Sequence, residues 1–207
     1  MNMSLTTTTV LTGFTYLVFN RYYNMCDHNY QDLLPYKSND IVLDIGAYEG
    51  CSSFEACKIV KQVISIEPEL SSYLKLLDKI NELQINNIIP INIGVYNKKG
   101  FVAFDAKSNM GSQILSSQIL IQVDTIDNIL DNLNINVNFI TMDIEGSEIE
   151  ALQGATETLK HVNKIVIAAY HYRSDLNEKT YKYVDKFLRD NGFTTFIDNG
   201  YLVHGWK

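Results

Sequence analysis

Two carboxylates, Asp143 and Glu145, follow an apolar run in the segment MDIEGSE at residues 142–148. Because alternate residues of a strand project from the same face, these side chains would share one face at the carboxyl end of a strand. Carboxylates placed there are costly unless they serve a ligand or a polar network. We therefore expect both to take part in catalysis or ligand binding, although Glu145 could instead cap the backbone amides beside Gly146.

A histidine, His171, comes shortly after the next apolar run, Ile165–Ala169. If consecutive strands pair, His171 lies beside the strand that leads to Asp143. It could then act as a general base or hold a substrate, and a structural histidine with satisfied hydrogen bonds is the alternative. Asp143, Glu145 and His171 offer oxygen and nitrogen donors, but their spacing is not diagnostic of a metal site, so no metal ligand is assigned.

A glycine-bearing loop, DIGAYEG at 44–50, follows the apolar run Ile41–Ile45. Its glycines allow a tight turn and a close approach of backbone to a ligand. The loop is not the dinucleotide fingerprint, because the second and third glycine positions of that pattern hold Tyr48 and Cys51. A binding loop for a ligand without a pyrophosphate is therefore favoured, and an ordinary strand-to-helix turn is the alternative.

A second carboxylate, Glu67, directly follows another apolar run and lies 23 residues beyond Asp44. An acidic residue at such a strand end can accept hydrogen bonds from both hydroxyls of a ribose. The alternative is a helix-entry glutamate that complements the helix dipole before Pro68. Asn92 could offer an amide to an adenine edge and Gly94 could let a flat base lie close, although a simple turn glycine is the more common case. Loop and carboxylate together indicate a nucleoside cofactor.

The elements that must position these residues alternate between strands and helices. Apolar runs bounded by turn residues predict strands, and Pro90 favours an edge position for the third of them. Extended, hairpin-like segments are expected between Tyr96 and Asp124, with a mobile loop at 108–112. The predicted strands are 41–45, 63–66, 88–93, 139–144 and 165–169, with a terminal hairpin of 193–197 and 201–205; the predicted helices are 52–61, 69–83, 124–133 and 177–190.

This alternation predicts a doubly wound, mostly parallel α/β sheet that ends in an antiparallel hairpin. Ser147 and Glu150 form a capping-box pattern at the start of a helix that follows the fourth strand. Asn191 and Gly192 are typical of the end of the helix predicted at 177–190. Ligands of such sheets bind at the carboxyl ends of the strands, which is where the candidate residues lie.

Length and composition agree with a single domain. The chain has 207 residues, of which 46% are hydrophobic, and no linker or repeat divides it. We expect residues 1–39 to be a lead-in segment, helical near 27–34 and part of the same domain, and residues 40–207 to form the main domain. The apolar stretch at 10–19 is too short and too interrupted to span a bilayer and lacks the marks of a secretory signal, so a cytoplasmic protein is expected.

The charge balance narrows the class of partners. Acidic residues number 24 against 17 basic ones, giving a formal net charge of −7. Such a surface repels phosphate backbones, so no nucleic-acid partner is expected. Three cysteines are too few and too unevenly spaced for a disulfide framework or a zinc site, and reduced thiols are the simpler account. The oligomeric state is not indicated by the sequence.

Five segments in order along residues 40–172 resemble the FkbM family of S-adenosylmethionine-dependent methyltransferases. The resemblance implies a class I methyltransferase (Rossmann-like) fold with a seven-stranded sheet and one antiparallel strand. It also implies methyl transfer to a hydroxyl oxygen of a sugar, a glycan or a small natural product, the acceptor being the expected partner. The segments are VLDIGAYEG (42–50), ISIEPE (64–69), NIGVYN (92–97), VDTID (123–127) and MDIEGSEIEALQGA (142–155).

Carried over by position, the resemblance implies that the glycine loop holds the methionine end of the cofactor and that Glu67 holds its ribose hydroxyls. Asn92 and Gly94 would lie near adenine, and Asp143 near the sulfonium and the substrate. Asp143, His171 and Glu145 are the residues expected to be catalytic. The residues expected to bind S-adenosyl-L-methionine are Asp44, Gly46, Ala47, Tyr48, Glu49, Gly50, Glu67, Pro68, Asn92, Ile93, Gly94 and Asp143.

Two positions depart from the family pattern. The family usually has a lysine where this chain has Thr141, and often a glutamate where it has Ala169. These departures favour, as an alternative, a protein of the same fold that binds the cofactor for sensing or scaffolding without transferring methyl. A nicotinamide oxidoreductase is a third possibility, which Tyr48 disfavours because its bulk would hinder a pyrophosphate.

Overall fold

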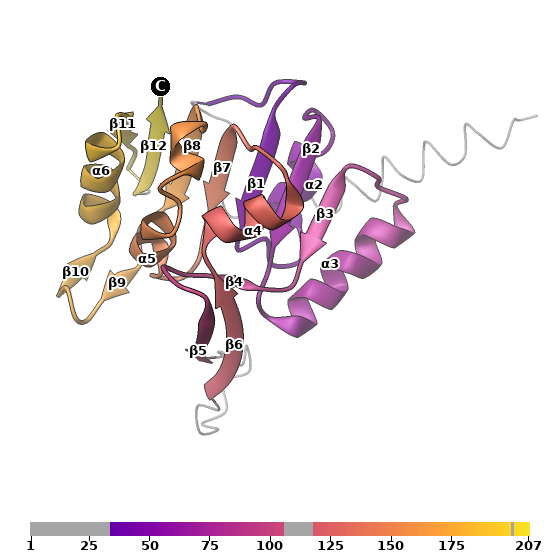
Figure 1. Cartoon of the computed structure of the whole chain (residues 1–207), viewed down its shortest axis with the longest axis horizontal. Coiled ribbons are helices and arrows are strands. Elements are labelled where there is room, and N and C mark those ends of the chain that lie inside the picture. The colour runs from indigo at the N-terminus through magenta and orange to yellow at the C-terminus, as the bar shows by residue number, and fades with distance from the viewer. Residues whose placement is uncertain (1–33, 106–117, 200) are drawn as a thin grey trace, which may run out of the picture.

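The computed structural model describes residues 34–105, 118–199 and 201–207, which form an α/β fold around one large sheet (Figure 1). The sheet has seven strands in the order β11-β12-β8-β7-β1-β2-β3. Neighbours are parallel except around β12, which is antiparallel to both β8 and β11. The strands are β1 Ile41–Ile45, β2 Gln62–Ile66, β3 Ile88–Ile91, β7 Phe139–Met142, β8 Lys164–Ala168, β11 Thr194–Ile197 and β12 Leu202–Trp206.

The central strands are apolar because both of their faces are buried. Along β1, Val42 packs into one hydrophobic cluster while Leu43 and Ile45 pack into the other. Strand β7 behaves in the same way, with Phe139 on one side and Ile140 on the other. Successive side chains of a strand point to opposite faces, so a continuous apolar run is what a doubly covered strand requires.

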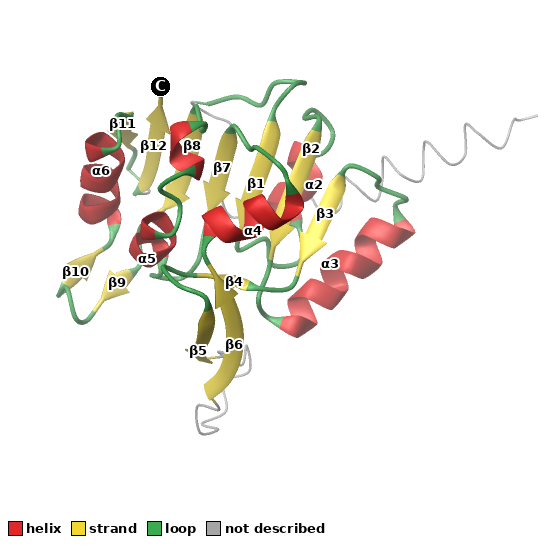
Figure 2. Ribbon diagram, viewed as in Figure 1, coloured by secondary structure: helices red, strands yellow, loops and turns green. Residues whose placement is uncertain are grey.

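Helices cover both faces of the sheet (Figure 2). Buried side chains of α4, α5 and α6 belong to the cluster on one face, and those of α2 and α3 to the cluster on the other. The helices are α2 Cys51–Ala56, α3 Leu70–Glu82, α4 Ile126–Leu133, α5 Glu148–Gln153 and α6 Tyr181–Asp190, with a 3-10 turn, η1, at Thr158–Lys160.

The helix ends show where sequence signals are confirmed and where they are wrong. Asn191 ends α6 and Gly192 follows with φ of 82°, as predicted. The predicted capping box is wrong, because the Ser147 side chain makes no capping hydrogen bond at the start of α5. The helix predicted to run to 61 ends at Ala56, and the one predicted from 177 begins at Tyr181.

Two smaller sheets extend from the carboxyl edge of the large one. Strands β4 (Gly94–Val95), β5 (Gly100–Asp105) and β6 (Gln118–Asp124) form a sheet in the order β4-β6-β5, and β5 pairs with β6 antiparallel, which confirms the predicted hairpin-like segments. Strands β9 (Tyr172–Arg173) and β10 (Glu178–Lys179) form a short antiparallel ribbon before α6. The mobile loop predicted at 108–112 lies outside the described residues, as does almost all of the helix predicted near 27–34.

The edges of the large sheet are consistent with its sequence. Strand β3, which contains Pro90, lies at one edge, as expected for a residue that lacks an amide hydrogen.

Tyr36, in the stretch before β1, is buried with its ring 5.2 Å from that of Phe139. Cys57 is a free thiol, whereas Cys51 is disulfide-bonded, so the expectation of reduced thiols is wrong for Cys51.

Among the helices of the described residues, none combines the length and the apolar character that crossing a bilayer would demand.

Candidate active site

The carboxyl ends of β1, β2 and β7 are tied together by backbone hydrogen bonds. The amides of Gly46 and Ala47 donate to the carbonyl of Ile66 at 2.9 and 3.0 Å. The amide of Asp143 donates to the carbonyl of Ile45 at 2.9 Å. The loops that follow these strands therefore form one edge of the sheet, where ligands of this fold class bind.

The glycine loop after β1 needs its glycines for two separate reasons. Gly46 has φ of 81°, and a Cβ there would lie 1.9 Å from the carbonyl oxygen of Asp143. Gly50, with φ of 93° at the start of α2, would place a Cβ 2.5 Å from Leu76. Both positions thus combine a left-handed backbone with a lack of space. Tyr48, between them, also has a positive φ of 51° and is 54% exposed, so its side chain stands outside the packed core.

Asp44, at the carboxyl end of β1, is buried and surrounded by hydroxyl groups. Its carboxylate accepts hydrogen bonds from Ser52, Ser53 and Thr141, the last at 2.9 Å. Burial raises the pKa of Asp44, while these three hydroxyls act in the opposite direction. Asp44 therefore links the first turn of α2 to β7, and it can position the glycine loop from beneath.

Glu67 directly follows the last residue of β2 and is also buried. One carboxylate oxygen accepts the amide of Tyr48 and the other accepts the amide of Glu69, both at 2.8 Å. Burial raises the pKa of Glu67, partly offset by these two amides. Each oxygen of a carboxylate can accept more than one hydrogen bond, so this arrangement fixes the side chain and still allows it to accept from a diol.

Two other predicted cofactor residues, Asn92 and Glu49, make contacts that hold neighbouring segments. The Asn92 amide group donates to the carbonyls of Glu67 and Pro68 at 2.9 and 3.1 Å, and so holds the loop after β2. Glu49 forms ion pairs with Lys75 and Lys79 on α3, which lower its pKa.

Packing explains the other three predicted positions near this loop. A Cβ at Gly94 would lie 2.9 Å from Val123, so close packing against β6 accounts for this glycine. Ala47 is buried, and Ile93 packs against the core cluster that contains Val95.

The three residues predicted to be catalytic do lie together, but the expected strand alternation of Asp143 and Glu145 is wrong, because β7 ends at Met142 and Glu145 has φ of 55°. The Nε2 atom of His171 lies 3.6 Å from Asp143 Oδ1 and 3.5 Å from Glu145 Oε2. Burial alone would lower the pKa of His171, but the hydrogen bond to Glu148 and the nearby carboxylates outweigh it and raise that pKa. Tyr170 packs its ring 4.2 Å from the imidazole, and its hydroxyl lies 3.5 Å from Asp143 Oδ2.

Two residues that are not among the predicted site residues, Glu148 and Arg173, complete the site. Glu148, in the first turn of α5, is fully buried and its Oε1 lies 3.1 Å from Nδ1 of His171. Arg173 on β9 donates to both oxygens of Glu150 at 2.7 Å and to the carbonyl of Gly146 at 3.3 Å. A glutamate one residue after a helix-capping position and an arginine two residues after His171 were the only available signals.

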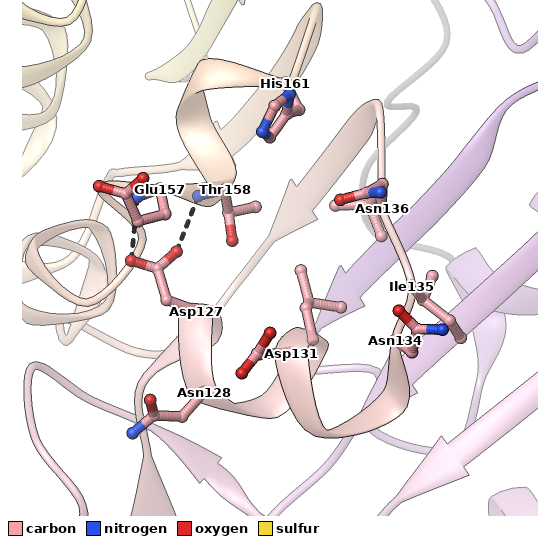
Figure 3. A pocket seen from close by; sticks show the side chains of 11 residues that line it. Asp127, Asn128, Asp131, Asn134, Ile135, Asn136, Glu157, Thr158 and His161 are labelled. Atoms are coloured by element: carbon pink, nitrogen blue, oxygen red, sulfur yellow. Dashed lines mark hydrogen bonds between the residues drawn. The ribbon is translucent and has the colours of Figure 1, made fainter.

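A separate surface groove of about 410 Å³ lies at the other end of the sheet (Figure 3). It is lined by residues of α4, of the loop that leads into β7, and of the turn that leads to β8, including Asp131 and His161. Asp127 is engaged there in capping η1, because it accepts the amides of Glu157 and Thr158 at 3.0 and 2.8 Å. The groove is at the amino ends of β7 and β8 and is not part of the candidate site.

The sheet order, the single antiparallel strand and the loops at its carboxyl edge define a class I methyltransferase fold. Within this class, the model of the methyltransferase FkbM domain matches residues 44–195, and the chain belongs to that family. Hexuronic acid methyltransferase AglP from Haloferax volcanii is 23% identical to it over 136 residues, which cover 63% of this chain and 56% of that protein.

Solved structures show the same fold. The methyltransferase FkbM from Methylobacillus flagellatus KT gives a TM-score of 0.64 at 23% identity, covering 95% of this chain and 54% of that one. Fibrillarin from Aeropyrum pernix, whose structure contains S-adenosyl-L-methionine, gives a TM-score of 0.54 at 13% identity, covering 92% and 73%. The chain thus spans little more than half the length of AglP and of the Methylobacillus protein.

Proposed function

We propose that the chain is an S-adenosylmethionine-dependent methyltransferase that methylates a hydroxyl oxygen of a sugar, a glycan or a small natural product. The observation that carries the proposal is the buried carboxylate of Glu67, held by the amides of Tyr48 and Glu69 at the carboxyl end of β2. A carboxylate fixed in this place suits the two hydroxyls of a ribose. Membership of the methyltransferase FkbM family supports the same conclusion.

The residues of the site fit a nucleoside with an amino-acid tail. The carboxylate of Glu67 can accept hydrogen bonds from the two hydroxyls of a diol, and no positively charged side chain is needed for this contact. At Gly46 and Gly50 a side chain would collide with neighbouring atoms, so the absence of side chains at these positions keeps the loop after β1 narrow. Asp44 lies beneath that loop, held by three hydroxyls. We assign the methionine end of the cofactor to this loop and the ribose to Glu67.

When bound, S-adenosylmethionine supplies an electrophilic methyl carbon on a cationic sulfur. The chain must then hold the acceptor oxygen in line with that carbon and exclude water. Orientation of this kind lowers the activation barrier by several kcal/mol, with an upper limit of about 7–11 kcal/mol. Asp143 provides a negative charge at the place assigned to the sulfonium. The proton of the acceptor hydroxyl passes to a base, for which the carboxylate of Asp143 and Nε2 of His171 are the two candidates.

A carbohydrate acceptor is favoured over other hydroxyl compounds. AglP, which resembles this chain over 63% of its length, is named as a hexuronic acid methyltransferase. The net charge of −7 argues against nucleic acid as the acceptor. We assign the acceptor pocket to the side of the site formed by Asp143, Glu145 and His171, together with the sheet of β4, β5 and β6.

The cofactor assignment is tested by calorimetric titration of the whole chain with S-adenosylhomocysteine. Glu67→Gln should weaken binding by at least about tenfold, because charge-assisted hydrogen bonds to two hydroxyls are each worth about 1.5–3 kcal/mol. Glu69→Gln is the matched control: its carboxylate lies two residues away but only caps α3 through Ser71 and Ser72. Equal affinity in the wild type and Glu67→Gln would disprove the ribose assignment.

A cofactor-binding protein without transferase activity remains the second candidate, and one observation favours it. Residue 169, where the family often has a glutamate, is an alanine, so this position supplies no carboxylate to the site. Transfer of a labelled methyl group to any member of a panel of sugars and glycans would exclude this candidate. Absence of transfer, with S-adenosylhomocysteine binding intact, would favour it.

A further inference from the structure

The imidazole of His171 is held in one orientation by a buried carboxylate. Its Nδ1 lies 3.1 Å from Oε1 of Glu148, and the same oxygen accepts the amide of Gly146 at 2.9 Å. An oxygen that accepts one amide in this way acts as an acceptor toward the imidazole as well, so in the neutral imidazole Nδ1 carries the hydrogen and Nε2 carries the lone pair. The side chain of His171 is only 10% exposed, so this orientation is fixed by packing too.

The other imidazole nitrogen, Nε2, points at two carboxylates without bonding to either. It is buried and has no hydrogen-bond partner among the described residues. Asp143 Oδ1 and Glu145 Oε2 lie 3.6 and 3.5 Å away, beyond the 2.7–3.2 Å that is typical of hydrogen bonds to nitrogen. A lone pair facing two carboxylate oxygens is repulsive unless a positive charge lies between them.

The spacing of these atoms is that of ligands around one cation. One atom each of Asp143, Glu145 and His171 lies within 4.8 Å of the others. Metal–ligand bonds of about 2.1 Å at angles between right and tetrahedral separate neighbouring ligand atoms by roughly 3.0–3.4 Å, close to the distances seen here. Glu148 behind the histidine reproduces the carboxylate–histidine–metal arrangement in which a second carboxylate orients the ligand.

The negative charge of the group around His171 also favours a bound cation. Three carboxylates, those of Asp143, Glu145 and Glu148, lie within 3.6 Å of a single imidazole. Even a protonated His171 would leave two negative charges in this group of four side chains. A bound divalent cation would balance them, and it would use the lone pair that Glu148 directs toward Asp143 and Glu145.

We propose that Asp143, Glu145 and His171 form a binding site for a divalent cation, with Glu148 as the positioning residue behind His171. Two carboxylates and one imidazole, with the remaining positions open to water or a ligand, suit Mn²⁺. The binding of the cation is independent of the proposed function. Its role rests on that function: the open positions would hold oxygens of the acceptor, His171 would be a metal ligand, and the hydroxyl proton of the acceptor would pass to the carboxylate of Asp143, the other candidate base.

The test is a titration of the whole chain with Mn²⁺, followed by electron paramagnetic resonance, in which the signal of free Mn²⁺ falls as the ion binds. We expect one Mn²⁺ per chain, with affinity lowered at least about tenfold in Asp143→Asn, Glu145→Gln and His171→Gln. The Glu145 side chain is 68% exposed, so Glu145→Gln will fold even if the buried changes do not. Glu82→Gln, at an exposed carboxylate on α3, is the control and should bind as the wild type does.

Two further readouts separate this inference from the proposed function. A pulsed resonance experiment should detect coupling of Mn²⁺ to an imidazole nitrogen, and His171→Gln should remove it. The same samples titrated with S-adenosylhomocysteine report on the cofactor site independently. If the wild type leaves the free Mn²⁺ signal unchanged, or if Glu145→Gln and His171→Gln bind as tightly as the wild type, the cation site is disproved whether or not the cofactor binds.

Discussion

Gly46 and Asp143 approach each other so closely that no side chain fits at position 46 between the loop after β1 and the loop after β7. A Cβ on Gly46 would lie 1.9 Å from the carbonyl oxygen of Asp143 and 3.1 Å from a methyl group of Ile144. The loop assigned to the methionine end of the cofactor thus rests on the backbone of a residue assigned to the sulfonium. One substitution at Gly46 should therefore disturb both.

Gly46→Ala should lower the free energy of unfolding by about 2–6 kcal/mol, because strain at a positive φ and overpacking each cost about 1–3 kcal/mol. Affinity for S-adenosylhomocysteine should fall with it. Gly100→Ala is the matched control, since a Cβ there would meet nothing within 4 Å. Denaturant unfolding of both variants measures the effect, and equal stability of the two would contradict the close approach.

Thr141, at a position where the family usually has a lysine, supports the buried carboxylate of Asp44. Its hydroxyl donates to buried Asp44 at 2.9 Å, so a neutral donor supports a carboxylate whose pKa is raised by burial. Thr141→Val keeps the shape and removes the donor, and it should cost about 1.5–3 kcal/mol of stability, typical of a hydrogen bond to a charged group. Thr141→Ser keeps the hydroxyl and should cost less; the reverse order in thermal or urea unfolding would refute this role.

Glu67 should give stability a defined dependence on pH. Burial raises its pKa above the ordinary value of 4.5, so the folded chain holds this proton more tightly than the unfolded chain. The stability contributed by Glu67, relative to Glu67→Gln, should be fully present below pH 4.5 and decline as the pH rises through the folded-state pKa. Urea unfolding of both proteins across this range measures the difference. A difference that grows with rising pH would mean that the folded-state pKa is lowered instead.

Asp143 distinguishes a transferase from a protein that only binds the cofactor. Asp143→Ala should abolish transfer of a labelled methyl group to whichever sugar the wild type accepts, because it removes the charge near the sulfonium and one candidate base. Glu157→Gln, at an exposed residue beside the groove of Figure 3, should transfer as the wild type does. Undiminished transfer by Asp143→Ala would remove this residue from the reaction.

The fold could be predicted from the sequence because its signals are local. Apolar runs such as Ile41–Ile45 and Phe139–Met142 have the length and the continuous apolar character of strands in a sheet that is covered on both faces. Pro90 predicts an edge strand because proline has no amide hydrogen to donate to a neighbouring strand. The order of the strands then follows from the family resemblance rather than from any one segment.

The site could be predicted only in part, because its finer contacts join residues far apart in the chain. In sequence Glu148 resembles an acidic residue at a helix start. Its contact with His171, 23 residues later, is visible only in the folded chain. Ser147 has the right type for a cap, but its side chain makes no capping bond, and Glu148 accepts the amide of Gly146 instead. Thr141 departs from the family pattern in sequence, and only its hydrogen bond to Asp44, 97 residues away, explains its hydroxyl.

The central claim is that Glu67 holds the ribose of S-adenosylmethionine. A crystal structure of the chain with S-adenosylhomocysteine tests it most directly. The account predicts both ribose hydroxyls within hydrogen-bond distance of the Glu67 carboxylate, with the amino-acid tail over the loop of Gly46 and Gly50. A nucleoside bound elsewhere, or a Glu67 side chain turned away into solvent in the complex, would contradict it.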